Sequence, residues 1–246
     1  RQLQGGDLLM DVFETPEARA QVQFDLAKQI LSEECKAPIE HCLGNHDIWG
    51  WSQKKSGTTG TEARWGKMWW LEWTGYGKTY RSFDRGGWHF IVLDSVQPGD
   101  TGGYKPILDN EQFAWLEADL AACDPKTPVL VLSHIPIFSV GAMLWGGKEE
   151  KDGQWKIIRA LMHLDARKIK DLFAKHPNVK LCLSGHIHLL DRIVYNNVTY
   201  ICTGAVSGNW WKGKFQETAE GFGELALYED GAFDYDYRNY GWEVPK

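Results

Sequence analysis

Three separate apolar runs in this chain each end in side chains that could bind a metal or move a proton. These side chains are Asn45, His46 and Asp47 after residues 39–43, His134 after residues 129–133, and His186 and His188 after residues 181–185. Open α/β sheets place their active sites at the C-terminal ends of parallel strands. We therefore expect these side chains to meet at one edge of a sheet.

The residue types at these positions favour a transition metal. His186 and His188 are two residues apart, so in an extended loop their imidazoles point to the same side. Asp7 follows Gly5 and Gly6, and a carboxylate on a glycine turn could bridge two metals. Imidazole and carboxylate ligands together suit Zn, Mn, Fe or Ni. The predicted metal ligands are Asp7, Asn45, His134, His186 and His188.

Two of these residues also have simpler interpretations. Asp7 beside two glycines could be an ordinary turn residue. His134, before Ile135-Pro136, could be a histidine that packs in the core with its polar atoms satisfied. Taken together with the paired histidines, however, the pattern favours a metal centre.

The order of these motifs resembles a known family. Four motifs follow one another along the chain: Gly-Asp at residues 6–7, Gly-Asn-His-Asp at 44–47, His134 shortly before a proline, and Gly-His-x-His at 185–188. This order resembles the calcineurin-like metallophosphoesterases, above all their bacterial cyclic-nucleotide-phosphodiesterase-like branch. The resemblance implies an α/β fold with two packed sheets and helices outside, a four-layer α/β/β/α sandwich.

The resemblance also implies a reaction. Two divalent metal ions (Mn, Fe or Zn) about 3.5–4 Å apart would support in-line attack of a metal-bound hydroxide on a phosphate ester. The substrate would be a small phosphodiester or phosphomonoester, because the arginine motifs of the protein-phosphatase relatives do not match here. The protein would then be a metal-dependent phosphoric ester hydrolase.

Each motif residue receives a role from the resemblance. His46 would stabilise charge or protonate the leaving oxygen, and Asp47 would hold the tautomer of His46. Among the ligands, Asp7 would bridge the two metals, Asn45, His134 and His186 would bind the second metal, and His188 would bind the first.

One motif of the family is absent from this sequence. The family opens with an Asp-x-His motif on its first strand, and it helps to hold the first metal. Only six residues precede Asp7, and they contain neither Asp nor His. We therefore expect either that the complete protein is longer or that occupancy of the first metal site is impaired. The second case would make the chain a catalytically weakened scaffold that acts as a binding protein.

Composition limits the partners. The 246 residues carry a net charge of −6, which does not favour bulk nucleic-acid binding, although a single nucleotide could bind at a metal. There is no apolar run long enough to span a membrane and no signal peptide. The five cysteines lack metal-site or disulfide spacing, and free thiols weakly favour the cytoplasm. Export stays open because of the incomplete N-terminal motif, and the oligomeric state is unknown.

A single domain over residues 1–246 is expected, because the motifs run from one end of the chain to the other. Residues 49–78 form a Trp-rich insertion that we expect to pack over the edge with the metal ligands. Trp clusters of this kind usually pack loops onto a sheet, but an aromatic rim around a pocket is the alternative.

Periodicity predicts helices at residues 17–33, 111–122 and 166–175, and hairpins turning at 86–87, 196–197 and 230–231. The first helix should bury Val22, Leu26 and Ile30. Asp165 should cap the third helix, and His163 should lie at the surface. Asp191 could contact a ligand histidine or simply begin a strand.

Overall fold

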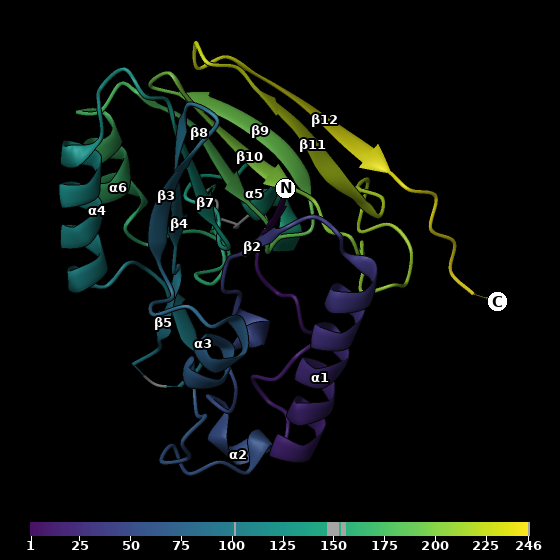
Figure 1. The fold of residues 1–246 in the computed structure, drawn as a ribbon. Coiled ribbons are helices and arrows are strands. Elements are labelled where there is room, and N and C mark those ends of the chain that lie inside the picture. The colour runs from purple at the N-terminus through teal and green to yellow at the C-terminus, as the bar shows by residue number, and fades with distance from the viewer. Residues whose placement is uncertain (101, 147–152, 154–155, 246) are drawn as a thin grey trace.

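A six-stranded mixed sheet forms the centre of the computed structural model, which describes all residues except 101, 147–152, 154–155 and 246 (Figure 1). Its strand order is β3-β4-β7-β8-β10-β9, with β4, β7, β8 and β10 parallel and the two edge strands antiparallel. The strands are β3 (Arg81–Arg85), β4 (Trp88–Leu93), β7 (Val129–Ser133), β8 (Val179–Ser184), β9 (Leu190–Tyr195) and β10 (Val198–Thr203).

Side chains of the central strands alternate between two hydrophobic layers, as the period of two along a strand requires. Val129 and Val131 face one layer, whereas Leu130 and Leu132 face the other. The first layer is closed by two helices, α4 (Asn110–Ala122) and α6 (Ala166–Phe173). Asp109 caps the start of α4, because its carboxylate accepts the backbone N–H of Gln112 at 2.8 Å. The helix predicted at residues 111–122 is confirmed.

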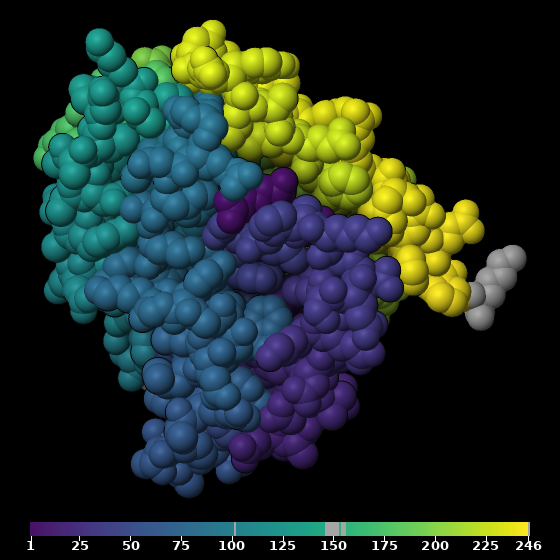
Figure 2. Space-filling view, viewed as in Figure 1, coloured from purple at the N-terminus to yellow at the C-terminus, as the bar shows by residue number. Residues whose placement is uncertain are grey.

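The opposite face of the sheet is covered by two strand pairs. These are the parallel pair β1 (Gln2–Gln4) and β2 (Ile39–His41), and the antiparallel hairpin of β11 (Gly221–Leu227) and β12 (Phe233–Asn239). Leu3, Leu225 and Phe233 from these pairs pack on the second hydrophobic layer. In the space-filling view, the N-terminal residues lie at the surface beside the yellow C-terminal hairpin (Figure 2).

The outer helix on this side is α1 (Glu17–Glu34), and its buried face differs from the prediction. Ala20 and Phe24 are buried, and the Phe24 ring stacks on Trp69 with centroids 4.8 Å apart. The expected inward stripe is exposed instead, at 63% for Val22, 53% for Leu26 and 48% for Ile30. The prediction was wrong because the indole rings of the Trp-rich insertion, and not the sheet, determine which face of this helix is covered.

The Trp-rich insertion is ordered around its indoles. It contains two short helices, α2 (Gln53–Ser56) and α3 (Met68–Thr74). Trp49, Trp69 and Trp70 are buried, which favours the packing interpretation over an open aromatic rim. Trp70 shares a hydrophobic cluster with Ile135, one residue after His134, so the insertion packs against the edge of the sheet where the motif residues lie.

Three further short elements lie among the described residues. They are the antiparallel pair β5 (Val96–Pro98) and β6 (Tyr104–Pro106), and helix α5 (Gly141–Gly146). The hairpins predicted at residues 86–87, 196–197 and 230–231 are all present. The α/β class and the layered order of helix, sheet, sheet and helix are confirmed. No helix among the described residues combines the length and apolarity needed to cross a membrane.

Candidate metal centre

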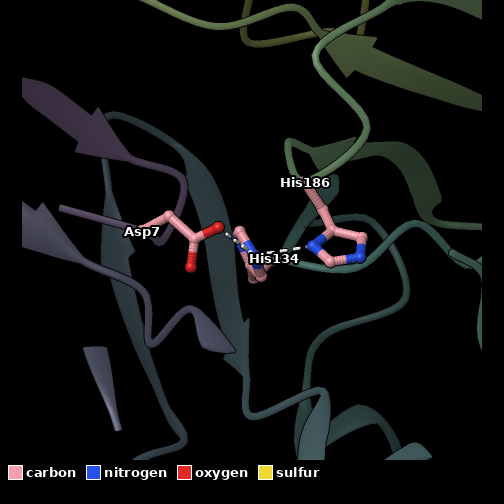
Figure 3. Close-up of side chains that lie close together, drawn as sticks. All are labelled: Asp7, His134 and His186. Atoms are coloured by element: carbon pink, nitrogen blue, oxygen red, sulfur yellow. Dashed lines mark hydrogen bonds and ion pairs between the residues drawn. The ribbon is translucent and has the colours of Figure 1, made fainter. Parts of the chain in front are cut away.

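Four loops deliver polar side chains to one edge of the molecule. Asp7 follows β1, and Asn45 lies in a 3-10 turn (Asn45–Asp47) after β2. His134 follows β7 and His186 follows β8. Because β1 is parallel to β2 and β7 is parallel to β8, each pair of loops leaves its strands in the same direction. Figure 3 shows Asp7, His134 and His186 pointing toward one another from separate elements.

The ligand atoms converge on one imidazole nitrogen. Nε2 of His134 lies 3.1 Å from Oδ2 of Asp7, 3.2 Å from Oδ1 of Asn45 and 3.1 Å from Nδ1 of His186. The ligand atoms of Asp7, His134 and His186 all lie within 4.8 Å of one another. The structure therefore brings together four of the five predicted ligands.

Backbone carbonyls determine which nitrogen of each histidine carries a proton. A carbonyl can only accept a hydrogen bond. The carbonyl of Gly5 lies 2.8 Å from Nδ1 of His134, and that of Ala160 lies 3.0 Å from Nε2 of His186. Each of these nitrogens must therefore donate, so in the neutral imidazoles Nε2 of His134 and Nδ1 of His186 carry lone pairs.

When both imidazoles are neutral, lone pairs of His134, His186, Asp7 and Asn45 therefore meet within 3.1–3.2 Å of Nε2 of His134. Either a proton on that nitrogen or a bound cation relieves the repulsion between them. Two nitrogens with two oxygens are a ligand set that divalent Zn, Mn or Fe accepts. The residues present therefore fit the second metal of the resemblance, while their role as ligands stays a prediction.

The backbone is strained where these side chains are presented. Asp7, His186 and His188 have φ of 53°, 68° and 59°. This left-handed region is costly for residues other than glycine and is concentrated at functional sites. A Cβ atom on Gly44 would lie 2.1 Å from both the backbone nitrogen and Oδ1 of Asp7, so the close approach of the two loops requires glycine there.

The electrostatics of the centre follow from this crowding. Burial would raise the pKa of Asp7, but His134 and His46 outweigh it and lower that pKa well below its usual range. Burial opposes protonation of His134, yet the charge of Asp7 raises its pKa. Burial, reinforced by the nearby His134, lowers the pKa of His186 to about 3. The imidazole of His186 is thus neutral at physiological pH.

His46 occupies the rim of the centre with a different carboxylate partner from the one predicted. Its backbone N–H donates to Oδ1 of Asp7 at 2.9 Å, and its Nδ1 lies 3.3 Å from Oδ1 of Asp11. Burial works against protonation, but Asp11 and Asp7 raise the pKa of His46 to about 9. Asp11 was missed in the sequence because it follows Asp7 by four residues and belongs to no recognised motif.

The predicted contact between Asp47 and His46 is wrong. The carboxylate of Asp47 accepts the backbone N–H of Leu9 at 3.0 Å and of Gly44 at 2.9 Å. It is fully buried, and burial together with the charge of Asp7 raises its pKa to about 7. Asp47 therefore ties the loop of Asp7 to the loop of Asn45 and does not orient the imidazole of its neighbour.

His188 lies outside the converging group. Its Nδ1 lies 2.5 Å from the carbonyl of Gly208, and its ring stacks on Trp210 with centroids 4.5 Å apart. This contact leaves Nε2 as the nitrogen with a lone pair. Within the described part of the chain, Asp7, His134 and His186 are the one such cluster of three acidic, histidine or cysteine ligands. Binding of the first metal by His188 stays a prediction.

The structure also places the residues whose roles were left open. Asp191 lies at the start of strand β9, as one of the two alternatives expected. Its Oδ2 accepts the Ser139 hydroxyl and the Gly141 N–H, both at 2.6 Å, so Asp191 also orders the start of α5. The five cysteines are free, and Cys42, Cys182 and Cys202 are buried. The prediction that His163 lies at the surface is wrong, because only 3% of it is exposed.

The sequence is similar to those of several known proteins. A family model described as calcineurin-like phosphoesterase matches residues 3–190. The chain is 27% identical over 169 residues to a Nostoc protein named 3′,5′-cyclic-nucleotide phosphodiesterase alr5338, covering 67% of this chain and 57% of that protein. It is 27% identical over 203 residues to a human protein named serine/threonine-protein phosphatase CPPED1, covering 82% and 57%. The chain thus spans little more than half the length of these relatives.

The fold has a solved counterpart. A crystal structure of a dimetal phosphatase from Danio rerio superposes with a TM-score of 0.58 at 15% identity, covering 96% of this chain and 80% of that one. At this identity the superposition shows a shared fold. The family match covers most of the chain and includes every predicted ligand. On these grounds the chain belongs to the calcineurin-like phosphoesterase family.

Proposed function

We propose that this protein is a metal-dependent phosphoesterase that hydrolyses a small phosphodiester or phosphomonoester. The observation that carries the proposal is the convergence of Asp7, Asn45 and His186 on Nε2 of His134, at 3.1, 3.2 and 3.1 Å. The names of the Nostoc and human relatives support phosphate-ester hydrolysis as the reaction class.

Asp7, Asn45, His134 and His186 would hold one divalent metal, and Asp7 with His188 would contribute to a second. When bound, such metals supply positive charge that stabilises the phosphoryl oxygens and lower the pKa of a water molecule. The protein's own part is to hold these ligands. The carbonyls of Gly5 and Ala160 fix both imidazole tautomers, and Asp47 ties two of the ligand loops together.

His46 is suited to act as the general acid. About one third of its side chain is exposed at the rim, where a leaving oxygen could reach it. Its raised pKa of about 9 keeps it protonated at neutral pH. Nδ1 is buried and faces Asp11, which leaves Nε2 as the nitrogen available to donate a proton to the departing alcohol.

The test is hydrolysis of bis-p-nitrophenyl phosphate and p-nitrophenyl phosphate in the presence of Mn²⁺. His46→Ala should lower kcat by about 10²- to 10⁴-fold while Mn²⁺ stays bound. His176→Ala, three residues beyond the end of α6, is the matched control and should retain activity. Full activity of His46→Ala would remove His46 from the mechanism. A phosphopeptide belongs in the same screen, because one relative is named a protein phosphatase.

The alternative is a metallophosphoesterase scaffold with weakened catalysis that acts as a binding protein. It is favoured by the position of His188, which lies apart from the four converging ligands. It predicts that the chain binds one equivalent of Mn²⁺ and releases no product from any of these esters. Two equivalents together with turnover would exclude it.

A further inference from the structure

A row of three polar side chains, two of them buried, lies behind the metal centre. Nε2 of His163 is 3.1 Å from Oγ of Ser133, and its Nδ1 is 2.9 Å from Oδ1 of Asp165. Ser133 and His163 are only 2% and 3% exposed. Polar groups this deep are costly to bury unless they are hydrogen-bonded, so the row needs a structural or functional reason.

The serine–histidine–aspartate order does not make this row a nucleophilic site. The Ser133 hydroxyl donates its proton to the carbonyl of Ile135 at 2.8 Å and not to the imidazole. A nucleophile must also be reached by substrate, and Ser133 is sealed in the core. The hydrogen-bonded side chains of Ser133, His163 and Asp165 therefore have a structural role, and we call them the clamp.

The clamp holds the segment Ala160–Asp165, which connects to the start of α6. Within this segment, the backbone N–H of His163 donates to the carbonyl of Pro136 at 2.9 Å. The Leu164 N–H donates to the carbonyl of Pro106 at 2.8 Å. The carboxylate of Asp165, predicted to cap α6, instead accepts the Leu108 N–H at 3.0 Å and faces His163. The only side-chain tie from this segment to the end of β7 in the described structure is that of His163 to Ser133.

This segment delivers the Ala160 carbonyl to His186. Nε2 of His186 lies 3.0 Å from that carbonyl and 3.4 Å from the hydroxyl of Tyr104. The two neighbours differ, because a carbonyl only accepts whereas a tyrosine hydroxyl can also donate. With the carbonyl in place, Nε2 must carry the proton, and Nδ1 presents its lone pair to the metal position.

Without the Ala160 carbonyl, the tautomer of His186 that is protonated at Nδ1 would have hydrogen-bond partners for both ring nitrogens. Tyr104 would donate to Nε2 of His186. A proton on Nδ1 would then point at the lone pair of His134 Nε2, 3.1 Å away. That hydrogen bond would occupy both nitrogens that the metal needs. The position of one carbonyl thus decides between an open and a self-blocked centre.

We propose that His163 is a positioning residue for the metal centre. By tying the segment Ala160–Asp165 to Ser133 at the end of β7, it keeps the Ala160 carbonyl on Nε2 of His186 and so keeps Nδ1 free for the metal. The metal part of this inference rests on the proposed function. The tautomer part concerns the chain's own protons and can be measured without metal.

The first experiment is long-range ¹H–¹⁵N NMR of the histidine rings in chelator-treated protein. Wild type should show His186 protonated at Nε2 alone. His163→Leu, which keeps bulk but loses both hydrogen bonds, should show a substantial population protonated at Nδ1. His163→Gln can still reach Ser133 and should restore the wild-type pattern. An unchanged His186 tautomer in folded His163→Leu would overturn the proposal. If that variant does not fold, Ser133→Ala cuts the same tie and decides in the same way.

The second experiment is a double-mutant cycle on Mn²⁺ affinity, read by EPR of the free ion. Loss of a residue that supports a metal ligand typically costs at least about 10-fold in affinity. His163→Leu should therefore weaken Mn²⁺ binding by about 10-fold in wild type, but have little effect in a His186→Ala background. His176→Leu is the matched control and should bind as wild type. Equal losses in both backgrounds would overturn the proposal. A chain that binds no Mn²⁺ would count against the proposed function, while the NMR result would still decide on His163.

Discussion

Replacing Gly44 by alanine should disable the metal centre by moving one loop against another. An added Cβ would lie 2.1 Å from both the backbone nitrogen and Oδ1 of Asp7. Real Cβ contacts essentially never fall below 3.0 Å, so the loops must separate by 3.0 − 2.1 = 0.9 Å or more. One of the two contacts is the backbone nitrogen of Asp7, which a side-chain rotation cannot move, so the displacement falls on the backbone of Asp7 itself.

A shift of about 1 Å in a catalytic group can cost about 10²-fold in rate, and overpacking typically costs about 1–3 kcal/mol in unfolding free energy. We expect Gly44→Ala to lower phosphodiester hydrolysis about 100-fold, to weaken Mn²⁺ binding and to lower Tm. Backbone strain does not contribute, because φ of Gly44 is −100°.

The assay compares Gly44→Ala with Gly5→Ala by kinetics, Mn²⁺ titration and thermal unfolding. Gly5 is the matched control because it lies two residues from Asp7, has no neighbour within 4 Å of an added Cβ and needs no positive φ. Gly5→Ala should behave as wild type. Wild-type metal binding and turnover in Gly44→Ala would refute the argument that this approach positions Asp7.

Three further outcomes are expected. Asp11→Asn removes the carboxylate that helps to raise the pKa of His46 to about 9. In a pH–rate profile, kcat falls at alkaline pH as His46 loses its proton, and this fall should move to lower pH in the variant. Asp119 and Asp84 raise the pKa of His89 above its unfolded value of about 6.5. The two ion pairs therefore stabilise the fold fully below that pH, and their contribution is lost as pH rises through the folded pKa. The Tm deficit of His89→Gln should be larger at pH 6 than at pH 9, and an equal deficit would contradict this reasoning. Phe24→Ala should cost about 3–5 kcal/mol in urea unfolding, whereas exposed Val22→Ala should stay within about 0.5 kcal/mol.

The central strands could be predicted because their signals are local. Residues 129–132 are apolar throughout and become a parallel strand buried on both faces. Asn196 and Asn197 adopt φ of 49° and 62°, which the hairpin turn requires and asparagine tolerates. In α1 the pattern misled, because Val22, Leu26 and Ile30 form as regular an apolar stripe as the face that is covered.

In the candidate site, too, local patterns predicted some features and long-range contacts decided the others. Asp7, Asn45, His134 and His186 were found because each follows a strand within a recognisable motif. The partner of His46 was misassigned, because Asp47 is adjacent in sequence but its carboxylate turns back to the N–H groups of Leu9 and Gly44. His163 was assigned to the surface, because no local pattern indicates that Ser133, 30 residues earlier, lies beside it.

The sequence by itself determined the family, the fold class and the residue types of the metal centre, because periodicity and motif spacing are properties of neighbouring residues. Tertiary structure alone decided which atoms of those residues face the centre. The Gly5 and Ala160 carbonyls lie 129 and 26 residues from the histidines whose tautomers they set. Asp11 reaches His46, and Trp210 covers His188, only through the packing of separate loops. Ring protonation depends on such distant contacts, and a sequence pattern records only which ring is present.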